Sequence, residues 1–131
     1  MRKAVRWRQR FQNFTHAYQL LSRTAGIPNP SEAERGGLIQ FFETAFELAW
    51  KTLKDYLEAQ GISTKSPREV LKQAFHMELI AEGHAWMEAL EDRNLIAHTY
   101  DEATSRKVEQ LIKEKYLPIL TTLHGSLSAK Q

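Results

Sequence analysis

Residues 39–51 read Ile-Gln-Phe-Phe-Glu-Thr-Ala-Phe-Glu-Leu-Ala-Trp-Lys, and this stretch decides the fold class. Its apolar residues recur every three or four positions, which is the period of one face of an α-helix. That face consists of Ile39, Phe42, Phe46, Ala49 or Trp50, Leu53 and Leu57. Ser31 with Glu34 is a capping-box signature, so the pattern predicts a helix that starts there and stops at Gly61. A start after the Gly36-Gly37 pair is the alternative, because glycine weakens a helix.

The same period recurs on both sides of this helix. A first helix is predicted from the apolar positions Trp7, Phe11, Phe14, Tyr18 and Leu21. It should end at the breakers Gly26, Pro28, Asn29 and Pro30. Ser66-Pro67-Arg68-Glu69 predicts the start of a short third helix, since Ser suits the cap position and Pro the first helical position. Its apolar residues are Val70, Leu71, Ala74 and Phe75.

Two more helices complete the prediction. The fourth follows a turn near Gly83 and includes Trp86, Leu90 and Ala97. The fifth carries Val108, Leu111, Ile112, Ile119 and Leu120, and Pro118 should kink it. Long helices with short connections predict an all-α, up-and-down bundle of about five helices, forming a single domain over residues 1–131.

Composition limits the class of protein. Hydrophobic residues make up 42% and charged residues 26% of the 131 residues, as in globular proteins. The chain has no cysteine, which excludes disulfides and thiolate metal sites. The first ten residues lack the apolar stretch of a signal peptide, and no apolar run is long enough to cross a membrane. We therefore expect a cytoplasmic protein that makes no contact with a membrane.

Charge is distributed unevenly along the chain. Residues 1–31 contain six Arg or Lys and no acid, whereas the remaining residues sum to −4. Such a basic segment suits nucleic acid, an acidic partner or the acidic part of its own dimer, and ordinary solvated helix charge explains it equally well. The aromatic residues Phe42, Phe46, Trp50 and Trp86 leave a similar choice between an internal core and part of a homodimer interface.

Few residues have a spacing that suggests chemistry. The sequence has no Gly-rich phosphate loop, His-Glu-x-x-His motif, nucleophile elbow or acidic metal cluster, so no cofactor or metal is expected. Glu43, Glu47 and Lys51 form an ordinary surface row at helical spacing. Four histidines stand alone and are expected to be structural or solvated: His16, His76, His84 and His124.

The remaining candidate is the segment Arg93-Asn94-Leu95-Ile96-Ala97-His98-Thr99-Tyr100. On a continuous helix, residues five apart point about 140° apart, so Arg93 and His98 converge only if the helix loosens near His98 or the flexible Arg93 side chain curls around. Asp101 is a natural N-cap and predicts a helix break close to His98. An imidazole and a guanidinium together could cleave RNA without metal, if a second copy supplies the second acid–base group. The plainer alternative is a surface ion pair of Arg93 with a nearby acid (Asp92, Asp101 or Glu102) and a His98 that caps the helix.

The chain also resembles a known family. Residues 39–51, Gly61-Ile62, residues 66–69, Gln73-Ala74-Phe75 and residues 92–100 are similar, in this order, to the nucleotidyltransferase substrate-binding proteins of the HEPN superfamily. The resemblance covers about residues 35–105. It implies a helical bundle, usually a homodimer, that works with a cognate minimal nucleotidyltransferase.

HepT-like toxins among these relatives are metal-independent ribonucleases with an Arg-x4-His-x-Tyr motif. The resemblance assigns Arg93 and His98 to catalysis with Asn94, and Tyr100 to adenylylation by the partner enzyme, which acts as antitoxin. Arg93, Asn94 and Asp101 are the candidates for binding RNA or nucleotide. The alternative is a noncatalytic subunit that presents a substrate or nucleotide to the nucleotidyltransferase.

Overall fold

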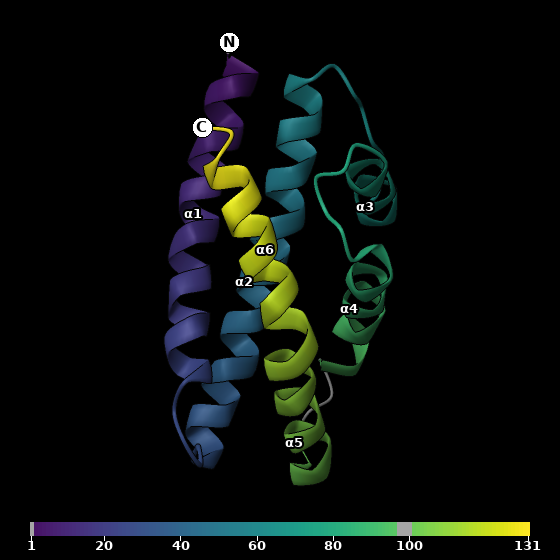
Figure 1. Ribbon diagram of the computed structural model, residues 1–131. Helices are drawn as coiled ribbons and strands as arrows, with labels where there is room; N and C mark the ends of the chain where they lie inside the picture. Colours follow the sequence, from purple (N-terminus) through teal and green to yellow (C-terminus); the bar gives the residue numbers. More distant parts are fainter. Residues whose placement is uncertain (1, 97–100) are drawn as a thin grey trace.

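The computed structural model describes residues 2–96 and 101–131, and of Asn94 and Leu95 only the backbone. These ranges contain helices and no strand, which confirms the all-α prediction. Figure 1 shows α1 (Arg2–Ala25) and α2 (Glu32–Ala59) beside a third rod made of α5 (Glu102–Leu111), η1 (Ile112–Tyr116) and α6 (Leu117–Ser128). The shorter helices α3 (Pro67–His76) and α4 (Gly83–Ile96) pack on the other side of α2 from α1. No helix of these residues is long and apolar enough to span a membrane.

Local signals set the ends of the helices as predicted. The Ser31 hydroxyl accepts a hydrogen bond from the Glu34 backbone N–H, and the Glu34 carboxylate accepts one from the Ser31 N–H. This complete capping box starts α2 before the Gly36-Gly37 pair, so a start after that pair is excluded. Gly61 has φ of +86° directly after the helix, a conformation that glycine adopts without strain.

The apolar faces of the helices meet in one core. Phe42, Phe46 and Trp86 are each 1% exposed, so these aromatic residues belong to the interior rather than to a dimer interface. Phe75 does not follow its predicted face, because its side chain is 52% exposed and lies against Gly83 at the surface. The largest fully buried side chains are Trp86, Tyr116, Phe14, Phe42, Phe46, Leu21, Leu38, Leu53, Leu57, Leu71, Ile112 and Leu120.

The last rod contains a π-helical turn just before Pro118. Proline has no backbone N–H to donate to the carbonyl four residues earlier, and its ring crowds that carbonyl. The wider turn η1 precedes Pro118. In this turn the Leu117 N–H donates a hydrogen bond to the Ile112 carbonyl, five residues earlier. The helix therefore continues from α5 into α6 through a π-turn, which lies close to Pro118, where the sequence predicts a kink.

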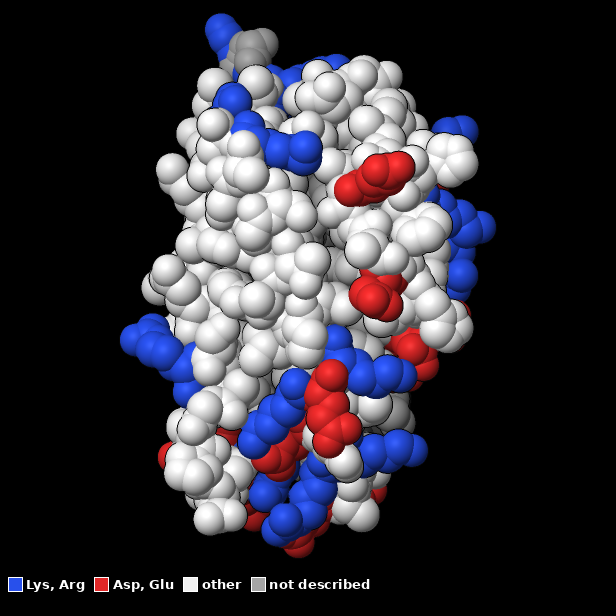
Figure 2. Space-filling view, viewed as in Figure 1, with Lys and Arg blue, Asp and Glu red and all other residues white. Residues whose placement is uncertain are grey.

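The basic first segment forms ion pairs within its own chain. The Arg10 Nε atom lies 2.9 Å from Asp55 of α2, and Arg6 lies 3.9 Å from Glu58. In Figure 2, charged side chains gather near the start of α1 and over α5, whereas the surface over α6 is largely uncharged. Part of the charge asymmetry of the sequence is thus used to join α1 to α2.

Candidate functional site

Arg93 lies in the last turn of α4, close to the start of the next helix. Its side chain is 43% exposed. Asp101 has an extended backbone (φ −88°, ψ 147°) and caps α5, so α4 and α5 are separate helices, as the sequence predicts. Ala97, His98, Thr99 and Tyr100 lie outside the described residues, as does the side chain of Asn94. Of the predicted catalytic residues, Arg93 is thus the one with a described side chain.

Arg93 forms an ion pair with a glutamate of α2 whose spacing predicts an ordinary surface row. The Arg93 Nη1 atom lies 3.6 Å from the Glu47 Oε2 atom. The same oxygen accepts a hydrogen bond from the Trp50 indole N–H at 3.0 Å, and Lys51 lies 3.3 Å from the other oxygen. The predicted pair of Glu47 with Lys51 is confirmed, but Glu47 also connects α2 to the end of α4.

The three acids predicted as alternative partners of Arg93 form other contacts. Asp92 accepts a hydrogen bond from the Tyr116 hydroxyl. Both carboxylate oxygens of Asp101 accept hydrogen bonds from Thr104, which hold the pKa of Asp101 below its ordinary value. The hydrogen bonds and the charge of Arg106 lower the pKa of Glu102 in the same way. Among the described residues, the interpretation of Arg93 as the partner of a neighbouring acid is therefore wrong.

Tyr116 ties the end of α4 to the core. It is 1% exposed, lies in η1 and stacks on Phe42 with ring centroids 5.5 Å apart. Burial, followed by the hydrogen bond to the Asp92 carboxylate, raises the pKa of Tyr116 well above its ordinary value. Tyr116 therefore stays protonated and donates to the residue that directly precedes Arg93. The π-turn that places Tyr116 thus contributes to the position of the candidate site.

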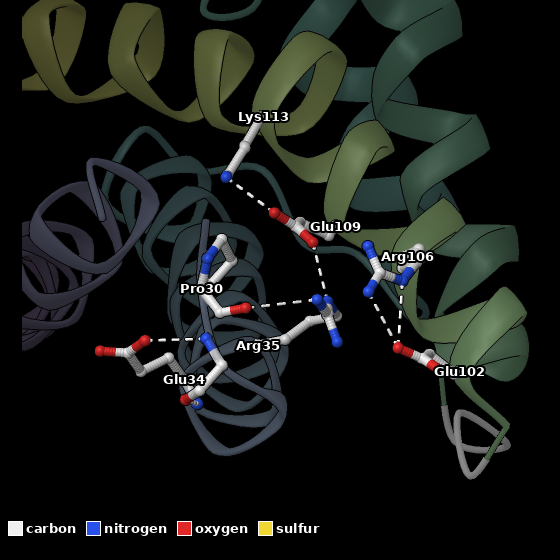
Figure 3. Close-up of polar contacts among 8 residues, drawn as sticks. Pro30, Glu34, Arg35, Glu102, Arg106, Glu109 and Lys113 are labelled. Carbon is white, nitrogen blue, oxygen red and sulfur yellow. Dashed lines mark hydrogen bonds and ion pairs between the residues drawn. The ribbon is translucent and has the colours of Figure 1, made fainter. Parts of the chain in front are cut away.

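A buried arginine network holds α5 against the start of α2. Figure 3 shows Arg35 between the Pro30 carbonyl and Glu109, with Lys113 on the other Glu109 oxygen. The Arg35 side chain is 5% exposed and its Nε atom lies 2.8 Å from the Glu109 carboxylate. Burial alone would raise the pKa of Glu109, but the hydrogen bonds from Lys113 and Arg35 outweigh it and the pKa is lowered. This network fixes the helix that Asp101 caps.

Two of the four isolated histidines, His124 and His84, have contacts that test the roles predicted for them. His124 stacks between Phe11 and Tyr18 and shares a hydrogen bond of 3.0 Å with Thr15. Its burial lowers its pKa. His84 is exposed and lies 3.8 Å from Glu88. For His124 and His84, the prediction of structural or solvated roles is confirmed.

A groove and a pocket are lined partly by residues of α2 near Glu47. A groove of about 430 Å³ is lined by Glu43, Thr44, Glu47, Leu48 and Arg93. A second pocket, of about 330 Å³, lies toward α5 and includes Arg35, Glu43, Glu102 and Ser105 in its wall. Within residues 2–96 and 101–131, no three His, Asp or Glu side chains are grouped to hold a metal ion.

Comparisons with known proteins bear on the family and the fold of this chain. A family model described as "Nucleotidyltransferase substrate binding protein like" matches residues 9–129. The chain belongs to this family. The resemblance noted from the sequence to the HepT-like, HEPN-type substrate-binding proteins is thereby confirmed.

One curated protein and one solved structure are similar to this chain. A protein named "Probable ribonuclease HepT" from Haemophilus influenzae is 31% identical over 77 residues, which are 55% of this chain and 53% of that protein. This chain thus spans about half the length of that curated relative in the match. A crystal structure of a protein from Thermus thermophilus is 31% identical and superposes with a TM-score of 0.76. That match covers 89% of this chain and 97% of the other, so the two share the bundle over nearly their full lengths.

Proposed function

We propose that this protein is the HEPN-type partner of a minimal nucleotidyltransferase in a toxin–antitoxin-like module, and that it is a metal-independent endoribonuclease of the cytoplasm. The observation that carries the proposal is the setting of Arg93. Its guanidinium is exposed at a helix end and makes one ion pair, through Nη1, with the described residues. The family match and the name of the Haemophilus relative support the same class of activity.

The proposed reaction is transesterification within RNA. A neutral His98 imidazole removes the proton of a ribose 2′-hydroxyl, and the oxygen attacks the adjacent phosphorus. The bond to the 5′-oxygen breaks, and a protonated imidazole gives that oxygen its proton. Arg93 binds the nonbridging oxygens and stabilises the charge that grows on them. Asn94 positions the phosphate, and the products are a 2′,3′-cyclic phosphate and a 5′-hydroxyl.

This reaction needs two imidazoles, because one His98 cannot be acid and base in the same step. We therefore propose a homodimer in which a second copy supplies the other His98. Sedimentation should show a dimer at micromolar concentration, and a monomer under those conditions contradicts the proposed arrangement. Asp101 remains a predicted substrate contact, although both of its carboxylate oxygens already accept bonds from Thr104.

The first test is cleavage of RNA in the presence of a chelator. The purified protein should leave 2′,3′-cyclic phosphate ends, and Arg93→Ala and His98→Ala should each lower the rate by about 10²–10⁴-fold. Circular dichroism should show the same helical content in both variants. His16→Ala is the control, since His16 lines a groove between α1 and α2, and it should keep the rate of the unmodified chain. Equal rates in all four proteins would reject the ribonuclease proposal.

The second test concerns the partner. We propose that the nucleotidyltransferase silences the toxin by adding AMP to Tyr100, because the new phosphate would pair with Arg93 and the adenosine would occupy the RNA site. Incubation with the cognate enzyme, ATP and magnesium should add one AMP mass to the peptide that holds Tyr100. Tyr100→Phe should remain active and resist silencing. An unmodified Tyr100 peptide in an inactivated protein would mean that the partner inhibits by binding alone.

A noncatalytic substrate-binding subunit is the second candidate. The family description favours it, and so does the polar pocket beside α5, whose wall combines the buried Arg35 with Glu43, Glu102 and Ser105. Such a pocket suits a small polar molecule better than a polynucleotide. If RNA stays intact, saturable nucleotide binding that Ser105→Trp removes would favour this function.

A further inference from the structure

The carboxylate of Glu47 is fixed by its own helix before it meets Arg93. Trp50 and Lys51, three and four residues later, reach back along α2 to the two Glu47 oxygens at 3.0 and 3.3 Å. Side chains at these spacings share one face of a helix. Trp50 is half-buried against the core, and the Lys51 ammonium lies 5.9 Å from its ring centroid. Glu47 is therefore an anchored acceptor rather than a freely moving surface acid.

The contact across to α4 involves one end of the guanidinium. Arg93 approaches the Glu47 Oε2 atom with Nη1. A guanidinium offers a second edge, formed by Nε and Nη2, whose parallel donors match two phosphate oxygens. That edge makes no hydrogen bond or ion pair with the residues that the structure describes. Glu47 thus holds one end of Arg93 and leaves its bidentate edge for an anion.

We infer that Glu47 is a positioning residue for RNA cleavage, because it orients the Arg93 guanidinium while leaving the Nε–Nη2 edge open to the scissile phosphate. This inference rests on the proposed ribonuclease function. It assigns chemistry to an acid that the sequence alone places in a surface row. Because both partners are about 40% exposed, the pair contributes little to folding, and its effect should appear in turnover.

The structure provides a matched control for the loss of negative charge. Glu43 lies one helical turn earlier on the same groove, and no ion pair joins it to Arg93. Glu47→Gln and Glu43→Gln each remove one negative charge beside the groove. General repulsion of phosphate predicts that both changes lower KM. Positioning predicts that Glu47→Gln alone lowers kcat.

The experiment is a double-mutant cycle with RNA cleavage as the readout. We expect Glu47→Gln to lower kcat by about two- to fivefold, which is the fold-change that matches the usual strength of an exposed ion pair. Glu43→Gln should not lower kcat. In an Arg93→Ala background, Glu47→Gln should change nothing further. Equal effects of Glu47→Gln with and without Arg93, or a kcat that Glu43→Gln lowers equally, would overturn the inference.

A second measurement separates this inference from the proposed function. Nitrogen-15 relaxation of the Arg93 Nε–H group, assigned with Arg93→Lys, reports its mobility without any activity. We expect this group to become more mobile in Glu47→Gln and to stay unchanged in Glu43→Gln. If the unmodified protein cleaves no RNA, the proposed function fails and the relaxation data still decide whether Glu47 orders Arg93. Unchanged mobility in Glu47→Gln would overturn the inference even in an active ribonuclease.

Discussion

Arg35 and Arg93 each pair with a glutamate of another helix, yet their surroundings differ in every other respect. Arg35 is 5% exposed, and two of its nitrogens donate, at 2.8 Å to Glu109 and at 3.3 Å to the Pro30 carbonyl. Arg93 is 43% exposed and forms one ion pair at 3.6 Å, which is longer than a hydrogen bond. Both arginines connect two helices, but Arg35 does so from a buried position and Arg93 from the exposed end of α4.

The difference shows what separates a structural arginine from one that can take a ligand. A guanidinium has five N–H donors, and burial makes each unpaired donor costly. Arg35 therefore has partners supplied by its own fold. Arg93 keeps donors in solvent, where an anion can replace water at little cost. Exposure and unused donors, rather than the presence of an ion pair, mark Arg93 as the candidate for phosphate binding.

The largest expected effect tests this contrast through stability. Arg35→Met removes the hydrogen bonds to Glu109 and to the Pro30 carbonyl, while Lys113 still pairs with Glu109, and should lower the free energy of unfolding by about 2–4 kcal/mol. Arg93→Ala should change it by less than about 0.5 kcal/mol, because its side chain is exposed. Urea denaturation followed by circular dichroism measures both values. Similar losses of unfolding free energy in the two variants would contradict the distinction between a structural Arg35 and a ligand-binding Arg93.

A double variant shows whether the loss at Arg35 comes from the Glu109 charge, which then has Lys113 as its remaining partner. Arg35→Met combined with Glu109→Leu removes both charges, and packed apolar pairs often match a buried ion pair in stability. We expect the double variant to recover most of the loss. If it is no more stable than Arg35→Met, the network stabilises the fold through another contact, and Lys113 is the next residue to test.

An intermediate effect is expected at Tyr116, which connects the buried region to the exposed one. Tyr116→Phe removes the hydrogen bond to Asp92 and should lower the free energy of unfolding by about 1–3 kcal/mol. RNA cleavage should also slow, because Asp92 directly precedes Arg93. Tyr18→Phe is the matched control, since the Tyr18 hydroxyl bonds to Thr121 at the surface. A stable Tyr116→Phe variant with full activity would show that α4 needs no such anchor.

The smallest effect is a dependence of stability on pH. Burial lowers the pKa of His124 in the folded protein below its ordinary value of 6.5, so the unfolded chain binds a proton more readily. Stability should be constant above about pH 6.5 and should fall as the pH drops below that value. His124→Gln should flatten this slope, whereas His84→Gln, at an exposed position, should leave it unchanged. Denaturation curves between about pH 7.5 and 5.5, a range around the ordinary histidine pKa, measure the slope.

The secondary structure follows from local sequence signals. The Ser31–Glu34 capping box, the Ser66 cap before Pro67 and the positive φ of Gly61 each act within a few residues. Such signals can be recognised in a single sequence because the residues that form the capping hydrogen bonds are close together in the chain. The helical faces were predicted for the same reason, except at Phe75, which packs on Gly83 outside the core. The position of Phe75 depends on how α3 packs against α4, which the helical period does not predict.

The candidate role of Arg93 and the helix boundary before Asp101 were predicted from residue types and spacing, which are local properties of a sequence. The pairing of Arg93 with Glu47, 46 positions earlier, rather than with an adjacent acid depends on how the helices pack. The tertiary structure also places Tyr116 on Asp92 and buries Arg35 against Glu109. The physical reason is that an ion pair depends on distance in space, and helix packing sets that distance. A sequence gives the charges, whereas the packing of α2, α4 and α5 selects their partners.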